Sequence, residues 1–199
     1  MKSNVCKIQN GTRDLAEILN ESERVANYNG LTHKQSLQLR LLCEEIDGML
    51  PNVTEDFDGE LWIDFEDGVC KVNVSIKIPE FNIDKKEALI SIAKNKKNAA
   101  AVGIVGKIRD SIENFFLDDV KMDALALSTV SYGMGAGYSE FADCDYLWRL
   151  EEYKMLAKSE ENRDVWDELE KSVIAAVADD VIVGVKGRKA NIVIVKKFV

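Results

Sequence analysis

A pair of strands joined by a tight turn is the feature of this sequence that most limits its fold. Apolar and polar residues alternate from Leu61 to Phe65 and again from Cys70 to Ile78. Such alternation places the apolar side chains on one face of each strand. Asp67-Gly68 lies between the two runs and is a strong hairpin signal. The segment therefore predicts an antiparallel hairpin with one face packed on helices and the other nearer water. The residues expected on that second face of the later strand are Lys71, Asn73, Ser75 and Lys77.

A helix that precedes the hairpin is expected to supply the packing for this sheet. Between Ser36 and Leu50, apolar residues recur at the three-and-four spacing of a buried helical stripe. They are Leu39, Leu42, Cys43, Ile46, Met49 and Leu50. Thr32 and Gln35 have the spacing of a capping box at the start of this helix, and Gly48 and Pro51 are expected to stop it. Glu45 lies at the margin of the stripe, where a carboxylate either faces a pocket or belongs to a solvated flank.

The remaining segments predict further elements on both sides of this core. A short strand is expected at residues 5–8, a helix from about residue 15 to Asn29-Gly30, and a closing hairpin at residues 181–196. Further helices are expected at about 84–93, 98–116, 145–158 and 162–178, with an irregular stretch at 118–140. The segregation of strands and helices predicts an α+β fold, a two-layer α/β sandwich with a mixed or antiparallel sheet covered by helices on one face. We expect a single domain over residues 1–199, with a helical insertion at about 84–160.

Charge and composition exclude several classes of function. The net charge is −9, which argues against binding of a nucleic-acid backbone. There is neither an apolar run long enough to cross a membrane nor a signal peptide, so a cytoplasmic location is expected. The four cysteines, Cys6, Cys43, Cys70 and Cys144, form no Cys-x-x-Cys pair, and His33 is the single histidine. These residues predict neither a zinc site nor a Cys/His catalytic pair, and Cys43 and Cys70 read as small core residues.

Three stretches resemble the histidine-kinase-like (Bergerat-fold) ATPase superfamily, and within it the anti-sigma-factor serine kinases. They are the helix LQLRLLCEE after Gly30-Leu31, the hairpin ELWIDFEDGVCKVNVSIKI, and the closing stretch SVIAAVADDVIVGVKGRKANIVIVKKF. The first is similar to the family helix whose pattern ends in Glu-x-x-x-Asn. The resemblance covers about residues 5–78 and 165–198. It implies the family's fold, an α/β sandwich, in a cytoplasmic, bacterial-type protein.

The resemblance also implies where a nucleotide site would lie. In that family the helix glutamate acts as a base or orients water, and the asparagine holds the magnesium ion that bridges the phosphates. Glu45 matches the glutamate, but Met49 stands where the asparagine should be. A thioether does not replace an amide oxygen on magnesium, a hard cation that prefers oxygen ligands.

The two glycine boxes of the family are altered as well. After Ile78 the sequence has Pro79 and Glu80, and Glu80 could at most imitate the adenine-binding aspartate because the glycines are missing. Before the closing helix stands WDELEKS, with acidic side chains where a phosphate would sit. The sequence therefore predicts a pseudoenzyme that has neither Mg-ATP nor another cofactor and acts by binding another protein. The resemblance suggests a transcription regulator as that partner, and a homodimer is compatible with the sequence.

An alternative interpretation is that the chain still binds a nucleotide. An ATP-binding serine kinase, ATPase or nucleotide sensor could have rebuilt its site from Glu45, Glu80 and a set of lysines in the insertion. These lysines are Lys94, Lys96, Lys97 and Lys107. The run Gly133 to Gly137 could serve as a phosphate loop, although a flexible loop explains it better. The lysines have a simpler interpretation too, a solvated segment between helices.

Aromatic residues near acidic ones mark a further candidate surface. Tyr146, Trp148 and Tyr153 are placed on the helix expected at 145–158, and Trp166 on the next helix. Trp and Tyr are enriched at interface hot spots, so this segment could contact a partner. Core packing is the alternative, and it is favoured for Trp166 by its position on a helical stripe.

Overall fold

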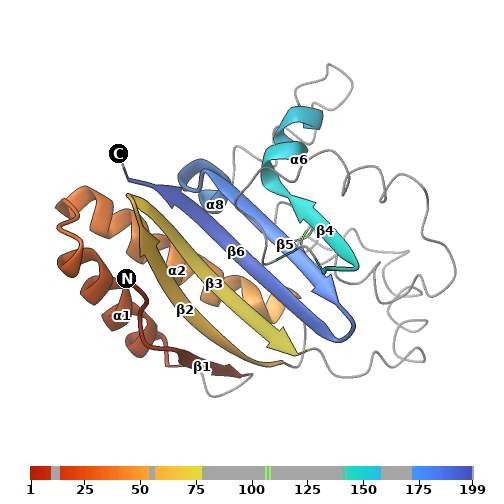
Figure 1. Cartoon of the computed structure of the whole chain (residues 1–199), viewed down its shortest axis with the longest axis horizontal. Helices are drawn as coiled ribbons and strands as arrows, with labels where there is room; N and C mark the ends of the chain where they lie inside the picture. The colour runs from red at the N-terminus through yellow and green to blue at the C-terminus, as the bar shows by residue number, and fades with distance from the viewer. Residues whose placement is uncertain are drawn as a thin grey trace, which may run out of the picture.

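The computed structural model describes residues 1–9, 14–53, 57–77, 106, 108, 141, 143–157 and 172–198. Within these residues the chain forms an α+β fold with a six-stranded antiparallel sheet (Figure 1). The strands are β1 (Cys6–Gln9), β2 (Asp58–Glu66), β3 (Val69–Lys77), β4 (Tyr146–Arg149), β5 (Asp180–Lys186) and β6 (Lys189–Lys197). Their order in the sheet is β1-β2-β3-β6-β5-β4. The central pair, β3 and β6, therefore joins the N-terminal strands to the closing hairpin.

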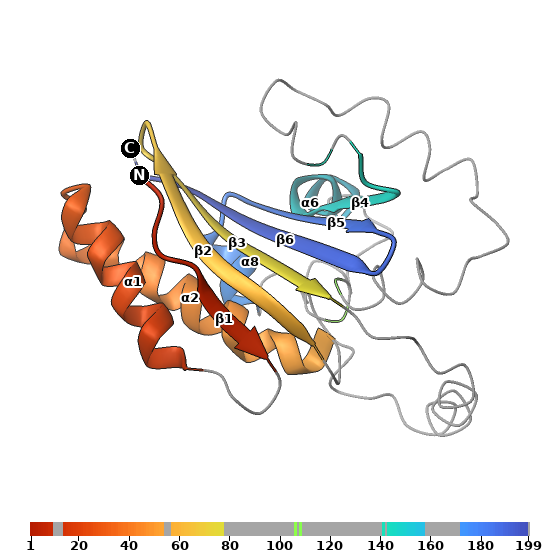
Figure 2. The same cartoon turned by 60° about the horizontal axis from the view of Figure 1, so that its bottom comes forward.

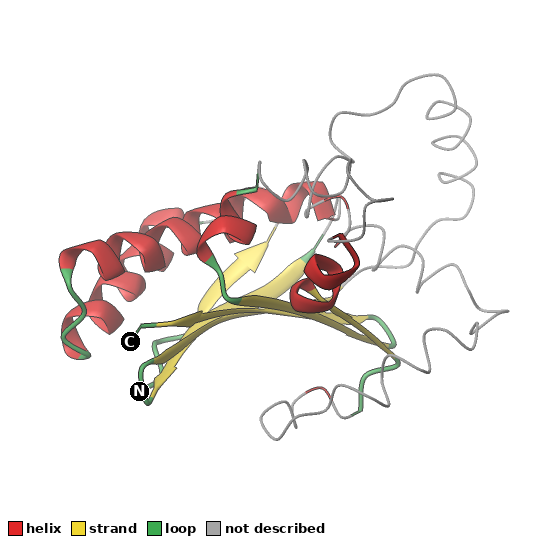
Figure 3. Ribbon diagram, turned by 90° about the horizontal axis from the view of Figure 1, so that it is seen from above, coloured by secondary structure: helices red, strands yellow, loops and turns green. Residues whose placement is uncertain are grey.

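The helices of the described residues gather on one face of this sheet. They are α1 (Leu15–Tyr28), α2 (His33–Val53), α6 (Leu150–Ala157) and α8 (Val173–Val177). Figure 3 shows them on the same side of the curved sheet. In Figure 2, β1 with α1 and β4 with α6 lie at opposite ends of the sheet. The sequence prediction of strands covered by helices on one face is thus confirmed.

The main hydrophobic core lies between α2 and the strands. Every apolar residue predicted for the α2 stripe is buried there, and Leu39, Leu42 and Ile46 have no exposed surface. The alternating residues of β2 and β3 meet this stripe from the sheet side, with Ile63 and Val72 directly opposite each other. Burying such aliphatic side chains contributes about 1.5–3 kcal/mol each. The 3.6-residue and two-residue periodicities therefore identified the two halves of one core.

The hairpin turn between β2 and β3 and the cap of α2 have the geometry that the sequence predicts. Asp67 and Gly68 both have positive φ, +50° and +77°, as a two-residue hairpin turn of this handedness requires. At the start of α2, the Gln35 side chain accepts a hydrogen bond of 2.9 Å from the Thr32 backbone N–H. The Gln35 backbone N–H in turn donates to the Thr32 hydroxyl at 3.4 Å. The hairpin and the capping box are both confirmed.

Two expected element boundaries are wrong. Helix α2 does not stop at Gly48 or Pro51 but continues to Val53. Pro51 lies in the last turn, where it removes only one intrahelical hydrogen bond, and buried Met49 and Leu50 hold this turn against the core. The helix expected at 145–158 begins only at Leu150, because Tyr146 to Arg149 form β4 and pair with β5. Pairing with a neighbouring strand overrides local helix preference.

The second face of the sheet, opposite the helices, departs from the expected polar surface. Asn73 is only 2% exposed and Ser75 only 8%. Asn73 lies opposite Val193 of β6, which belongs to a small second apolar cluster. The buried members of this cluster are Phe141, Ile182, Val193 and Val195. The prediction that this face lies near water is therefore wrong at the centre of the sheet, where β5 and β6 carry apolar residues on both faces.

Candidate functional site

Helix α2 carries the two positions that the sequence connects with nucleotide chemistry. Glu45 is half-buried on its flank, next to Glu44, whose carboxylate accepts a 3.1 Å hydrogen bond from Arg40 one turn earlier. Met49 is 3% exposed and belongs to the main core. The position matched to a magnesium-binding asparagine thus holds a thioether packed among apolar side chains, with no oxygen to offer a metal.

The other candidate residues lie outside the described residues: Glu80, Lys94, Lys96, Lys97, Lys107, the Gly133–Gly137 run and Trp166. Glu45 is therefore the single member of the candidate nucleotide site that the structure places. Among the described residues, no group of three or more His, Cys, Asp or Glu side chains could hold a metal ion.

Cys6, Cys43 and Cys70 offer no nucleophile at neutral pH. Burial raises the pKa of Cys6 to about 11 and that of Cys70 to about 12, and nearby carboxylates add to both shifts. Burial also raises the pKa of Cys43, which is fully enclosed in the core. Because the thiolate is the reactive form, these three thiols act as small core residues, as the sequence predicted for Cys43 and Cys70.

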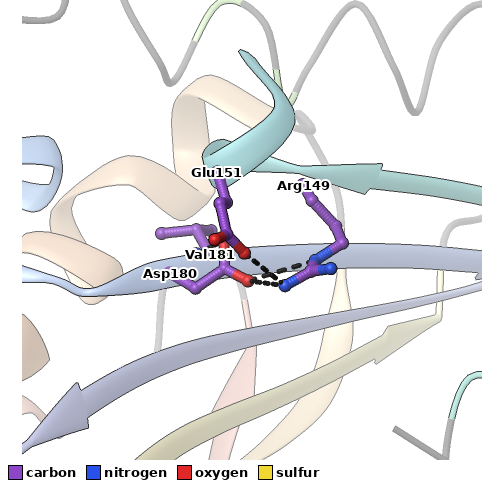
Figure 4. A network of polar contacts seen from close by, with 4 residues as sticks. All are labelled: Arg149, Glu151, Asp180 and Val181. Carbon is purple, nitrogen blue, oxygen red and sulfur yellow. Dashed lines mark hydrogen bonds and ion pairs between the residues drawn. The ribbon is translucent and has the colours of Figure 1, made fainter. Parts of the chain in front are cut away.

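A buried carboxylate at the start of β5 forms the most connected polar group of the described residues. One oxygen of Asp180, Oδ2, accepts hydrogen bonds from Arg149 Nη2 at 2.6 Å and from Nε at 3.1 Å. The other oxygen, Oδ1, accepts from the backbone N–H groups of Glu151 at 3.1 Å and of Val181 at 2.9 Å. Figure 4 shows the Arg149 guanidinium reaching both Asp180 and Glu151. Asp180 thereby caps the start of α6 and ties β4 to β5.

The hydrogen bonds of Asp180 indicate a structural role rather than a catalytic one. Both oxygens of Asp180 already accept two hydrogen bonds, so neither is poised to take a proton from a substrate. Sequence reasoning missed the pair because Arg149 and Asp180 are 31 residues apart. The only local signal was an aspartate directly before the apolar run at 181–185, where an ionised side chain needs a partner.

Glu152, beside this network, is the one carboxylate of the described residues with a resolved pKa shift. Burial raises the pKa of Glu152, Arg149 lowers it in part, and the negative charges of Asp180 and Glu151 raise it further. Two carboxylates of the first turn of α6 and that of Asp180 on β5 therefore interact with one guanidinium.

A second polar group lies on the second face of the sheet, near β1. Asp64 Oδ2 accepts hydrogen bonds from Trp62 Nε1 at 2.8 Å and from Asn73 Nδ2 at 3.1 Å. The Lys2 ammonium lies 4.8 Å from the centre of the Trp62 ring. These contacts satisfy buried Asn73 and cover half-buried Trp62, so they explain how polar residues persist at the centre of the sheet.

The aromatic residues of the expected partner surface are half-buried. Tyr146 and Trp148 lie on β4 and pack with Tyr153 against the main core. The rings of Trp148 and Tyr153 are 5.9 Å apart, in tilted contact. These three residues therefore contribute to packing, as the alternative interpretation expects, and a contact with a partner stays a prediction.

Comparison with known protein families, curated proteins and solved structures gives no match. Within the part of the chain that the structure describes, no helix is both long and apolar enough to span a lipid bilayer.

Proposed function

We propose that this chain is a protein-binding member of the histidine-kinase-like ATPase fold, most similar to anti-sigma-factor serine kinases, whose phosphotransfer site has been lost. The observation that carries the proposal is the burial of Met49, 3% exposed within the main core. Magnesium requires oxygen ligands at about 2.1 Å in near-octahedral geometry. The carboxylate matched to the family glutamate, Glu45, is half-buried and lies one turn away from that apolar position.

Exposed apolar residues on the helices support a role in protein binding. Tyr28 at the end of α1 is 76% exposed, and Leu37 in the second turn of α2 is 51% exposed. The two helices pack against each other and are joined by a short connection. Tyrosine is enriched among residues that dominate the binding energy of protein interfaces. A surface formed by this helical hairpin suits a protein partner, and the resemblance suggests a transcription regulator.

Nucleotide binding is the direct test. We expect the thermal midpoint of unfolding to be unchanged by ATP or ADP, with and without magnesium, and calorimetry to detect no binding heat. A nucleotide at a hundred times its Kd would instead stabilise the protein by about 2.7 kcal/mol. Magnesium-dependent binding with micromolar affinity would overturn the proposal and favour the ATP-binding alternative.

The helical hairpin provides the second arm of the test. A partner captured by the wild-type protein should be lost by the Y28A/L37A double variant. It should be retained by Met155→Ala, which removes a residue of 64% exposure on α6. Equal retention by all three proteins would show that the partner binds elsewhere.

A further inference from the structure

Three lysines form a row across the sheet that the sequence does not reveal. Lys77 of β3 lies directly opposite Lys189 of β6, and Lys189 lies directly opposite Lys186 of β5. All three are exposed, and they lie on the second face of the sheet, opposite the described helices. Figure 1 shows the C-terminal end of β3 beside the turn between β5 and β6. We call these three residues the lysine row.

Repulsion within the lysine row lowers the stability of the fold. Neighbouring strands lie about 4.8 Å apart, so three positive charges share a line of roughly 10 Å. Like charges directly opposite each other on a sheet are destabilising. Lys186 has one ion pair, 3.7 Å from Asp143, but Asp143 is 87% exposed and such surface pairs contribute little. Among the described residues, neither Lys77 nor Lys189 has an ion-pair partner.

We propose that the lysine row binds a short acidic helical segment of the protein partner. Carboxylates three and four residues apart on a helix are spaced by about 5–6 Å, close to the spacing of adjacent strands. One acidic helical stripe can thus place a carboxylate near each lysine in turn. The inference rests on the proposed protein-binding function and names the chemistry of the partner.

The ends of the lysine row favour a short partner over an extended polyanion. Asp58 lies directly opposite Lys77 at one end, and Asp143 stands beside Lys186 at the other. A nucleic-acid backbone or an anionic membrane surface would continue past the row and meet these carboxylates, on a chain of net charge −9. Lysine ammonium groups are also point charges without the planar fork that selects a phosphate.

The Lys189→Glu variant tests the proposal, because Lys189 is the middle member of the row. The probe is a fluorescently labelled helical peptide with glutamates at three-and-four spacing, followed by anisotropy at low ionic strength. We expect the variant to bind this peptide about tenfold more weakly, since an attraction is replaced by a repulsion. We also expect its thermal midpoint to rise, because a carboxylate between two lysines relieves their repulsion. A lysine with a merely structural role would not give a variant that is more stable and yet binds the peptide more weakly.

Lys7→Glu is the matched control, an exposed lysine of β1 that lies opposite Glu60. This control should keep the affinity of the wild-type protein for the peptide. A peptide with glutamine in place of glutamate should not bind. Equal losses for the two variants, or no binding by the wild-type protein, would overturn the proposal.

Competitors distinguish other anionic ligands. We expect inorganic phosphate, single-stranded DNA and vesicles containing anionic lipid to displace the peptide only at concentrations that screen charge generally. Tighter binding of any of them than of the peptide would overturn the acidic-helix assignment. Failure of this proposal is distinguishable from failure of the proposed function. If the lysine row does not bind the peptide, protein binding through α1 and α2 is unaffected. Binding of Mg-ATP contradicts the proposed function whether or not the lysine row binds the peptide.

Discussion

The two faces of the sheet are built on different principles. The helix-covered face is one continuous core, which contains residues of α2 and of β1, β2, β3, β5 and β6, and against which Tyr146 and Trp148 of β4 pack. The second face is divided into three parts: the polar group around Asp64, the small apolar cluster around Ile182, and the lysine row. The first face specifies the fold through simple periodicity. The second face carries the features that periodicity does not explain, among them the lysine row.

Matched substitutions of isoleucine give the largest expected contrast between the faces. Ile46 of the main core and Ile182 of the second cluster are almost equally buried, at 0% and 1% exposure. Within the range for such truncations, we expect Ile46→Ala to lower the free energy of unfolding by about 4 kcal/mol and Ile182→Ala by about 2 kcal/mol. The second cluster is smaller, so less packing is lost there. Urea denaturation measures both values, and equal losses would mean that the second cluster is a full second core.

The Asp180 network should come next in size. Asp180→Ala leaves the Arg149 guanidinium, 13% exposed, without its main partner. We expect a loss of about 3 kcal/mol, at the lower end for a broken buried pair, with faster hydrogen exchange confined to β4 and α6.

The neighbouring residue provides the control for Asp180. Asp179, with a side chain 39% exposed, accepts a hydrogen bond of 2.6 Å from the Lys197 backbone N–H. Asp179→Ala should cost about 1 kcal/mol, the usual net value of a hydrogen bond. Equal effects of the two substitutions would contradict the role of Asp180 as the anchor of β4 and α6.

Glycine-to-alanine substitutions should have opposite signs in the two regions. A methyl group at Gly184 would press against the Phe141 ring and come within 2.7 Å of Cys144 Sγ, so Gly184→Ala should destabilise by about 2 kcal/mol. A methyl group at Gly48 in α2 meets nothing within 4 Å. Gly48→Ala should therefore stabilise by about 0.5–1 kcal/mol through helix propensity. Thermal denaturation distinguishes the two, and a neutral Gly184→Ala would show that the second cluster is loosely packed.

The smallest expected effect is a pH dependence at Glu152. Because burial raises its pKa in the folded state above the ordinary value of 4.5, the unfolded state loses the proton first as the pH rises. The free energy of unfolding therefore falls as the pH rises from 4.5 to the folded-state pKa of Glu152. It stays at this lower value at higher pH. Glu152→Gln should be more stable than the wild-type protein at neutral pH and equal to it well below 4.5. A constant difference across a pH series of denaturation curves would contradict this explanation.

Features set by neighbouring residues could be predicted from the sequence. The hairpin at Asp67-Gly68, the capping box of Thr32 and Gln35, and the buried position of Met49 all follow from contacts within one turn or one helix. Each depends on local dihedral angles or a fixed period. That is why both the core and the apolar character of position 49 on α2 were predictable.

Features set by distant partners could not be predicted. Tyr146 to Arg149 run directly into a helix, and only pairing with β5 makes them a strand. The alignment of Lys77 with Lys189 needs the strand order of the sheet, which no local pattern contains. The Arg149–Asp180 pair requires the same knowledge. The candidate recognition features of the second face therefore depend on register rather than on sequence motifs.

The central position of β3 and β6 also affects how the chain folds during synthesis. Val69 of β3 pairs with Lys197 of β6, and Lys77 pairs with Lys189, so the middle of the sheet closes across more than a hundred residues of chain. During synthesis, β3 leaves the ribosome long before its partner and exposes unpaired backbone groups until β6 arrives. Contacts so distant in sequence make folding slow. The nascent chain is thus most prone to aggregation at the strand that becomes one of the most buried in the finished sheet.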